Sequence, residues 1–328
     1  MNKMKHCFIS KDNAERNLFR MRIRHCGPLN SNKIIYYIAE NNKNLGFFAM
    51  YRYWLEYLYF ADVCGYIPVI NVGSEFSYAD MEKVNETRNP FEYYFNQPAL
   101  IGVKSAKMSR NVINADIVHR QMVELIFTGK YCNYKANKRY MNAMGYIVKK
   151  YMRFNQSTWE YISMGMNQLN IDKGKILGVH IRGTDFRASY NNHPVYITEE
   201  ECFKEIDVLL YKKPYTRIFV ATDDSRILKR FVEKYERRIC YYDDIIRSDK
   251  NQSVAFSKNS RKNHKYLLGL EVIRDMYTLS VCSGLVAGVS QVAICAHINK
   301  LARGEHYEDI KIIDKGLNDN SHIFMRHS

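Results

Sequence analysis

Three side chains at the end of one apolar stretch, those of His180, Arg182 and Asp185, have types that could form a binding site. Residues 176–181 are apolar except at His180, a pattern typical of a parallel strand covered on both faces. Arg182 and Asp185 follow it directly. In open α/β sheets, ligands bind beyond the carboxyl ends of such strands. An Arg there suits a phosphate, because its planar guanidinium donates two parallel hydrogen bonds and stays charged.

A second apolar run, residues 217–222, ends at Asp223 and Asp224. Apolar residues at helical spacing follow from Ile227 to Tyr235, so this segment predicts a strand and then a helix. The simplest interpretation of the two carboxylates is N-capping, in which their oxygens accept hydrogen bonds from free backbone amides at the start of the helix.

A third junction of the same kind carries Ser290 and Gln291. Residues 285–289 predict a short strand, and a helix resumes at 292. A Ser at this position offers a hydroxyl and free amides at a helix N-terminus, which favour an anion; the alternative is a plain N-cap. The preceding predicted helix, over residues 267–279, carries Asp275.

The order and approximate spacing of these residues resemble the C-terminal half of the α1,6-fucosyltransferases and nodulation fucosyltransferases. That group is related to the protein O-fucosyltransferases and to bacterial α1,2-fucosyltransferases. The resemblance extends from Val179 to Val292 and rests on residues 179–185, 193–194, 219–224, 275 and 290–292.

The resemblance implies an α/β fold of the GT-B type, in which two Rossmann-like domains face each other across a cleft. We therefore expect an acceptor-side domain over residues 1–172 and a domain that holds the nucleotide-sugar donor over residues 173–328. GDP-fucose is the donor of the family, and the resemblance also implies that no metal takes part. A bare Asp223-Asp224 pair is no Asp-x-Asp metal motif.

The resemblance also implies roles for individual side chains. Arg182 would contact the donor diphosphate, and His180 and Asp275 would contact guanine. The remaining donor-binding candidates would lie near the phosphates or line the site: Asp223, Asp224, Ser290 and Gln291.

This chain departs from the family in two places. Many relatives have two adjacent basic residues where it has Arg182-Gly183, and Arg187 is the candidate for the second charge. Residues 188–192, where relatives carry an acidic residue thought to be the base, contain no carboxylate. Asp185 is then either the catalytic base or a residue that orients the loop. The other candidates follow the second predicted strand of the N-terminal half: Glu75, Asp80 and Glu82.

The N-terminal half predicts one β-turn-helix-β unit, from a strand near residues 34–38 through a helix over 47–64 to a strand over 68–72. Gly46 stands at the start of this helix. It resembles the glycine that reaches the donor diphosphate in fucosyltransferases, and the alternative is an ordinary turn glycine.

The net charge of +15 suits anionic partners. The basic residues are dispersed along the chain, which is compatible with a solvated surface or with a peripheral contact to an anionic membrane. Nucleic acid is disfavoured as a partner, because no recognised nucleic-acid motif accompanies the charge. Residues 247–263, rich in Ser, Asn, Lys and Arg, predict a loop near the site.

Eight cysteines without a Cys-x-x-Cys pair favour a reducing compartment. The sequence shows no apolar segment typical of a signal peptide or of a membrane span. We therefore expect a cytoplasmic enzyme of bacterial type at the inner face of the membrane. It would transfer fucose or a related sugar, with inversion, from a GDP-sugar to a glycan or lipid-linked glycan in surface polysaccharide synthesis. The alternatives are a catalytically silent GDP-sugar-binding scaffold and, less favoured, a basic nucleic-acid-binding protein.

Overall fold

The computed structural model describes residues 20–40, 42, 44–129, 134, 136–171, 173–251, 253–254 and 259–323. The chain divides into two compact units, Met1–Asn155 and Gln156–Ser328. We expected the boundary after residue 172, which is one helix later. Helix α7, Gln156–Gln168, instead belongs to the second unit, because it packs on helix α10, His264–Val281. The close approach depends on Gly165, where a Cβ would lie 2.7 Å from the Arg274 side chain.

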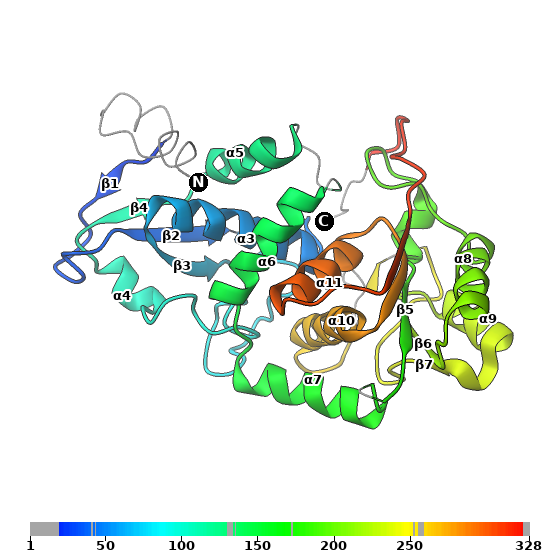
Figure 1. Ribbon diagram of the computed structural model, residues 1–328. Helices are drawn as coiled ribbons and strands as arrows, with labels where there is room; N and C mark the ends of the chain where they lie inside the picture. Colours follow the sequence, from blue (N-terminus) through cyan, green and yellow to red (C-terminus); the bar gives the residue numbers. More distant parts are fainter. Residues whose placement is uncertain are drawn as a thin grey trace. The chain divides into compact units, whose positions relative to one another are not determined.

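The N-terminal unit contains a mixed sheet with the strand order β1-β4-β2-β3 in its described part (Figure 1). Strand β2 pairs in parallel with β3 and with β4, whereas β1 pairs antiparallel with β4. The strands are β1 Ile23–Arg24, β2 Ile35–Glu40, β3 Ile67–Val72 and β4 Val112–Asn114. The helices are α3 Phe47–Cys64, α4 Val103–Lys107, α5 Ile117–Thr128 and α6 Lys138–Tyr151.

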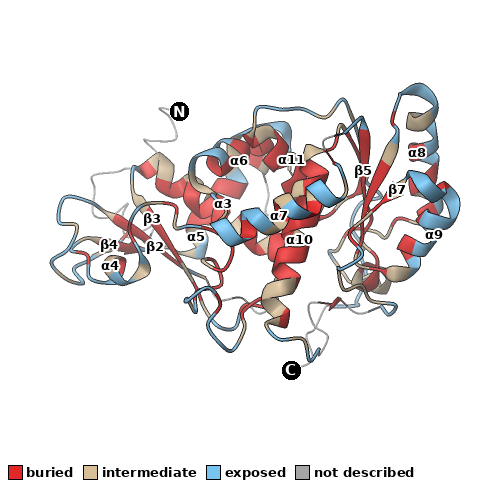
Figure 2. Cartoon of the chain, turned by 90° about the horizontal axis from the view of Figure 1, so that it is seen from below, coloured by how far each residue is buried: buried red, intermediate tan, exposed pale blue. Residues whose placement is uncertain are grey.

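Helix α3 connects β2 to β3, so the predicted β-turn-helix-β unit is confirmed. Its side chains are buried nearly all round, including Tyr51, Trp54 and Tyr57, and Figure 2 shows the helix largely in the colour of buried residues. Edge-to-face aromatic contacts fill this core; for example, the ring centroids of Trp54 and Phe91 lie 5.2 Å apart. The buried tyrosines of α3 therefore contribute to the packing of this core.

The C-terminal unit has a parallel sheet with the order β7-β6-β5-β8-β9 (Figure 1). Counted within the unit, this is the 3-2-1-4-5 order of a Rossmann-type sheet, whose order reverses between β5 and β8. The strands are β5 Ile176–His180, β6 Arg217–Ala221, β7 Ile239–Cys240, β8 Gly284–Gly288 and β9 Asp309–Ile313. Besides α7 and α10, the helices are η1 Thr184–Ala188, α8 Glu199–Lys212, α9 Ser225–Tyr235, η2 Glu236–Arg238 and α11 Gln291–Ala302.

Strands β5, β6 and β8 are buried along nearly their whole length, as continuous apolar runs predict. Helix α9 buries one stripe, Ile227, Leu228, Phe231 and Tyr235, against the core that β5 and β6 share. This packing fixes the carboxyl ends of β5 and β6 beside each other. None of the described helices is long and apolar enough to cross a bilayer.

Candidate active site at the carboxyl ends of β5 and β6

His180, the last residue of β5, is held in one tautomer by the neighbouring strand. Its Nδ1 lies 3.0 Å from the carbonyl oxygen of Ala221 and donates to it. Burial lowers the pKa of His180 to about 4, so the ring is neutral at physiological pH. Its Nε2 is buried and has no hydrogen-bond partner in the described part of the chain. The ring therefore has one hydrogen-bond acceptor, Nε2, and no described residue donates to it.

Two carboxylates bind the Arg182 guanidinium. Its Nη1 lies 2.8 Å from Asp223 Oδ2, and its Nη2 lies 2.8 Å from Asp185 Oδ1. Asp223 also accepts from the Gly183 amide at 2.9 Å. The Arg182 side chain keeps 27% of its surface exposed. The guanidinium is thus held in one orientation and is still partly exposed. This arrangement suits the binding of an anion.

The turn after Arg182 is tightly constrained. A Cβ on Gly183 would lie 2.4 Å from the Asp224 Cβ, so this position has no room for a side chain. Thr184 has φ 26°, a strained value for a β-branched residue. Its amide donates to Asp224 and its hydroxyl donates to Asp223. A basic side chain next to Arg182 would therefore not fit in this turn.

Asp224 is fully buried and serves the fold, which corrects the expectation that it lines the donor site. Its Oδ1 accepts from the Arg226 amide at 2.9 Å and caps α9. The Arg226 guanidinium occupies both carboxylate oxygens. The two neighbouring carboxylates therefore have different roles. Asp224 caps α9, whereas Asp223 binds Arg182.

Arg187, the candidate for the second charge, is bound by carboxylates as Arg182 is. Its Nη2 lies 2.8 Å from Glu199 Oε1, and its Nε lies 3.5 Å from Asp224 Oδ2. The guanidinium also stacks over the Tyr196 ring at 4.5 Å. These contacts join η1 to α8, and a contact of Arg187 with the donor stays a prediction.

Asp275 lies on α10 with only 8% of its surface exposed. Burial raises the pKa of its carboxyl to about 7, against the opposing effect of the Arg247 and Arg274 charges. It makes no hydrogen bond or ion pair among the residues that the structure describes, and its Oδ1 is buried. An unsatisfied buried carboxylate is costly, so Asp275 is the second acceptor here that lacks a partner.

Residues 247–263 provide two contacts that the sequence did not single out. Arg247 Nε donates to the Thr222 carbonyl at 3.1 Å, which places its charge beside the end of β6. Ser253 accepts from Arg182 Nη2 at 3.3 Å. The predicted loop therefore does reach the Arg182 site. In the sequence, the only sign of these two contacts was a basic residue and a hydroxyl residue within a polar segment.

Ser290 and Gly46 both stand at helix starts. Ser290 Oγ accepts from the Ala293 amide at 3.1 Å and caps α11, with Gln291 as the first helical residue. This junction follows β8, the strand next to β5. Gly46 is the N-cap of α3 in the other unit, and a Cβ there would meet nothing within 4 Å. The structure thus brings Ser290 to the edge that carries His180, while donor contact by Gly46 stays a prediction.

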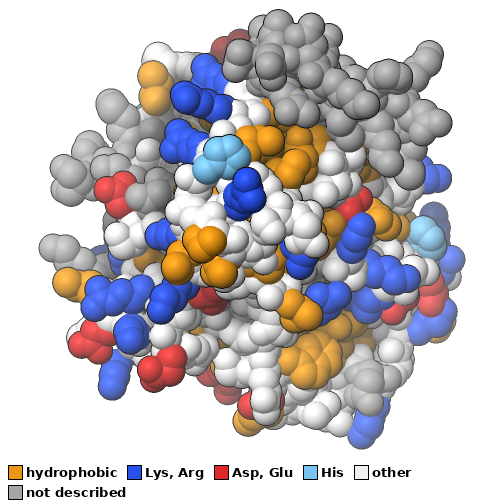
Figure 3. Space-filling model, turned by 90° about the vertical axis from the view of Figure 1, so that its left-hand side faces the viewer, with side chains coloured by type: hydrophobic (Ala, Val, Ile, Leu, Met, Phe, Trp, Pro, Cys, Tyr) orange, Lys and Arg blue, Asp and Glu red, His pale blue; other side chains and the backbone are white. Residues whose placement is uncertain are grey.

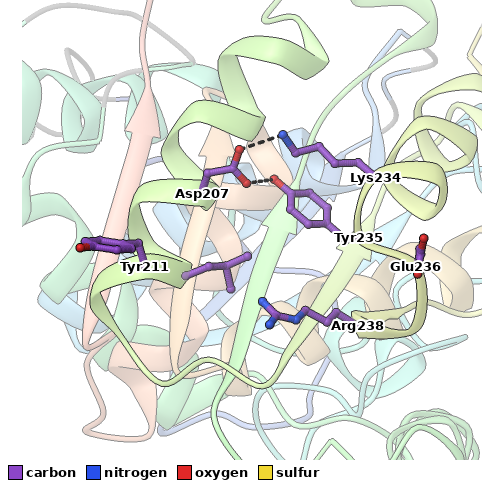
Figure 4. A pocket seen from close by; sticks show the side chains of 7 residues that line it. Asp207, Tyr211, Lys234, Tyr235, Glu236 and Arg238 are labelled. Atoms are coloured by element: carbon purple, nitrogen blue, oxygen red, sulfur yellow. Dashed lines mark hydrogen bonds and ion pairs between the residues drawn. The ribbon is translucent and has the colours of Figure 1, made fainter.

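A hollow in the same unit lies away from this site. It is lined where α8 and α9 end, by Asp207, Leu210, Tyr211, Lys234, Tyr235, Glu236 and Arg238. Figure 4 shows Asp207 between Lys234 and Tyr235, at 2.8 Å from each. These helices end before β6 and β7 begin, so the hollow is at the amino edge of the sheet, opposite His180 and Arg182.

The family model for α-(1,6)-fucosyltransferase N- and catalytic domains matches residues 138–305, about half of the chain. The chain belongs to the α-(1,6)-fucosyltransferase family. The match contains every candidate of the C-terminal unit, from His180 to Gln291. An α-(1,6)-fucosyltransferase of Caenorhabditis elegans is 28% identical over 155 residues, which is 45% of this chain. The aligned part is 26% of the nematode protein's length.

Solved structures agree with the family assignment at the level of the fold. The NodZ α-1,6-fucosyltransferase co-crystallized with GDP matches 82% of this chain and 93% of its own, at 13% identity and a TM-score of 0.50. POFUT1 in complex with GDP-fucose matches 84% and 97%, at 11% identity and a TM-score of 0.44. The first likeness shows the fold alone, and the second is too weak to carry an argument. The predicted α/β fold of the GT-B fucosyltransferases is confirmed.

Proposed function

We propose that this protein transfers fucose, or a related sugar, from a GDP-sugar to a glycan acceptor. The observation that supports it best is the pairing of an acceptor without a partner, His180 Nε2, with the clamped and partly open Arg182 at the end of β5. Family membership supports the donor class, and NodZ α-1,6-fucosyltransferase is described co-crystallized with GDP.

Guanine is the base that this proposal assigns to the buried acceptors. Its N1–H and N2–H groups are donors, and the Asp275 carboxylate would accept from them. Neutral His180 would accept a further hydrogen bond at Nε2, because its Nδ1–H is already used by Ala221. Uracil and cytosine cannot reproduce this pair of donors.

Arg182 would bind the diphosphate and stabilise its leaving charge. The acceptor hydroxyl attacks the anomeric carbon with inversion and gives its proton to a base, while the bond from that carbon to the diphosphate oxygen breaks and GDP leaves with the electron pair. Negative charge grows on the diphosphate in the transition state, so a cation fixed beforehand lowers the barrier without reorganisation. Ser290 and Gln291 would assist with hydrogen bonds at the N-terminus of α11.

The base remains to be assigned between two sets of residues. Asp185 is bound to Arg182 at 2.8 Å and to the Thr184 hydroxyl at 2.9 Å, which supports an orienting role. Glu75, Asp80 and Glu82 follow β3 in the N-terminal unit, whose sheet would serve the acceptor. The acceptor itself would be a glycan or lipid-linked glycan of bacterial surface polysaccharide synthesis. We place the enzyme in the cytoplasm, in peripheral contact with the membrane.

Calorimetric titration with GDP, UDP and CMP tests the donor assignment. A carboxylate left unpaired by the wrong base costs more than about 1.4 kcal/mol, so GDP should bind at least about tenfold tighter than UDP. Equal affinities would refute it. Hydrolysis of GDP-fucose, measured with and without EDTA, then tests turnover; we expect EDTA to leave the rate unchanged.

A catalytically silent scaffold is the second candidate. It is favoured by the bonding of Asp185 to Arg182 and by the absence of a carboxylate in residues 188–192. Selective GDP binding without hydrolysis of GDP-fucose, and without transfer to a panel of lipid-linked and free glycans, would support it over the enzyme.

A further inference from the structure

Two segments of the N-terminal unit carry many cations and no carboxylate. Residues 20–39 and 93–115 contain neither Asp nor Glu. Seven cations of these segments are exposed, and one of them, Arg20, pairs with Asp116. The other six, which we call the basic face, are Arg22, Arg24, Lys33, Lys104, Lys107 and Arg110. The charge of the chain is therefore more concentrated in space than its dispersed basic pairs suggest.

The two segments form one continuous surface. The Leu29 amide donates to the Met108 carbonyl at 3.0 Å, and the Arg110 amide donates to the Leu29 carbonyl at 2.7 Å. Strand β1 extends this surface, because Ile23 is paired with Ile113 of β4. Residues far apart in the sequence thus present their cations side by side.

The basic face lacks the ion pairs found elsewhere on the molecule. None of its six cations makes an ion pair within the described ranges, whereas in the other unit Arg230 pairs with Glu200 and Lys234 with Asp207. Three large apolar side chains are exposed among them: Leu29, Leu100 and Met108, at 40%, 108% and 45%. Figure 3 looks onto the side where β1, β4 and α4 lie, and shows Lys and Arg side chains interspersed with hydrophobic ones.

We propose that the basic face docks on an anionic lipid bilayer. Its cations would lie against lipid phosphates, and Leu29, Leu100 and Met108 would enter the headgroup boundary. Single-stranded nucleic acid fits less well, because it binds on exposed aromatic side chains, and the described part of these segments exposes none. This inference deepens the membrane contact in the proposed function and is independent of which nucleotide the other unit binds.

Co-sedimentation of the full chain with vesicles tests the proposal. One set of vesicles is pure phosphatidylcholine, and the other contains about one third phosphatidylglycerol. Each cation near an anionic surface contributes about fivefold in affinity, so the variant Lys104→Glu/Lys107→Glu/Arg110→Glu should bind at least about a hundredfold more weakly. The matched control Lys204→Glu/Lys212→Glu/Arg237→Glu changes the net charge equally, at exposed residues of the other unit without ion pairs.

The parent and the control should bind the anionic vesicles alike, and neither should bind phosphatidylcholine. Leu100→Ser should weaken binding several-fold, most visibly at high salt, where the charges are screened. Equal losses in the variant and its control would overturn the basic face, and so would RNA binding that depends on the basic face without vesicle binding. Titration with GDP separates the two proposals, because the basic-face variant should keep the parent's GDP affinity whether or not vesicles bind.

Discussion

Glu56 in the N-terminal unit and Asp275 in the C-terminal unit are both buried carboxylates, and burial raises the pKa of each to about 7. Their surroundings differ. The Tyr140 hydroxyl donates to Glu56 Oε1 at 2.8 Å, and guanidinium nitrogens of Arg52 and Arg120 lie within 3.9 Å of its oxygens. Asp275 is near Arg247 and Arg274 but bonds to neither among the described residues.

The difference separates a carboxylate with structural partners from one that has no bonded partner among the described residues. The partners of Glu56 come from α3, α5 and α6, so its charge ties three helices together. Burial of the Asp275 carboxylate costs free energy, and no bond to a described residue offsets that cost. Proteins typically keep such a destabilising residue where function requires it. Both residues have a raised pKa, so the contacts, rather than the pKa, distinguish their roles.

Removing Glu56 should produce the largest effect on stability. Glu56→Ala leaves Arg52 and Arg120 buried with less compensation and the Tyr140 hydroxyl without its acceptor, so the free energy of unfolding should fall by about 3–5 kcal/mol. Urea denaturation at pH 8 measures it. Asp275→Asn is the matched comparison and should leave stability unchanged or higher. Similar losses in both variants would remove the distinction.

Arg182→Lys should produce the largest effect on activity. Lysine keeps the charge but loses the planar fork that Asp185 and Asp223 hold in place, so transfer should fall by about 10²–10³. The circular dichroism spectrum and the unfolding midpoint should stay close to those of the parent. Turnover near the parent's would show that Arg182 serves the fold.

GDP affinity should depend on pH through Asp275. Guanine donors need the ionised carboxylate, so affinity should fall about thirtyfold from pH 8 to pH 5.5, given a pKa of about 7. His180 stays neutral over this range. Asp275→Asn should retain only the dependence due to the phosphates. A parent profile identical to that of the variant would exclude Asp275 from guanine binding.

The raised pKa of Asp275 also predicts how the stability of the protein changes with pH. The folded protein holds the Asp275 proton more tightly than the unfolded chain does. The stability that this proton contributes is therefore complete below the ordinary pKa of Asp and is lost as the pH rises through about 7. Unfolding of the parent and of Asp275→Asn between pH 4 and 8 measures it, and the stability of the parent should fall relative to that of the variant.

Asp185→Asn should have the smallest effect if Asp185 orients Arg182. The amide oxygen can still accept from Arg182, so transfer should fall by about tenfold, with a small loss of GDP affinity. Complete loss of transfer at unchanged GDP affinity would instead identify Asp185 as the base. A rate equal to the parent's would direct the search to Glu75, Asp80 and Glu82.

Local patterns were sufficient to predict most of the elements near the site. Apolar runs predicted β5, β6 and β8, and helical spacing predicted α9 and α10, because burial on a sheet or along a helical stripe constrains residue type at each position. The helix predicted over 47–64 matches α3. The domain boundary was placed too late, since the side of the boundary to which α7 belongs depends on its packing against α10.

The sequence by itself determined that His180, Arg182 and Asp223 stand at strand ends, because alternation between apolar runs and polar junctions is a property of the chain. Only the tertiary structure decided which carboxylate caps α9, which one binds Arg182, and that Asp275 has no bond to any described residue. It also decided that Arg187 pairs with Glu199 and that cations from two distant segments form the basic face. Such pairings depend on distances between residues far apart in the chain, and no local pattern encodes them.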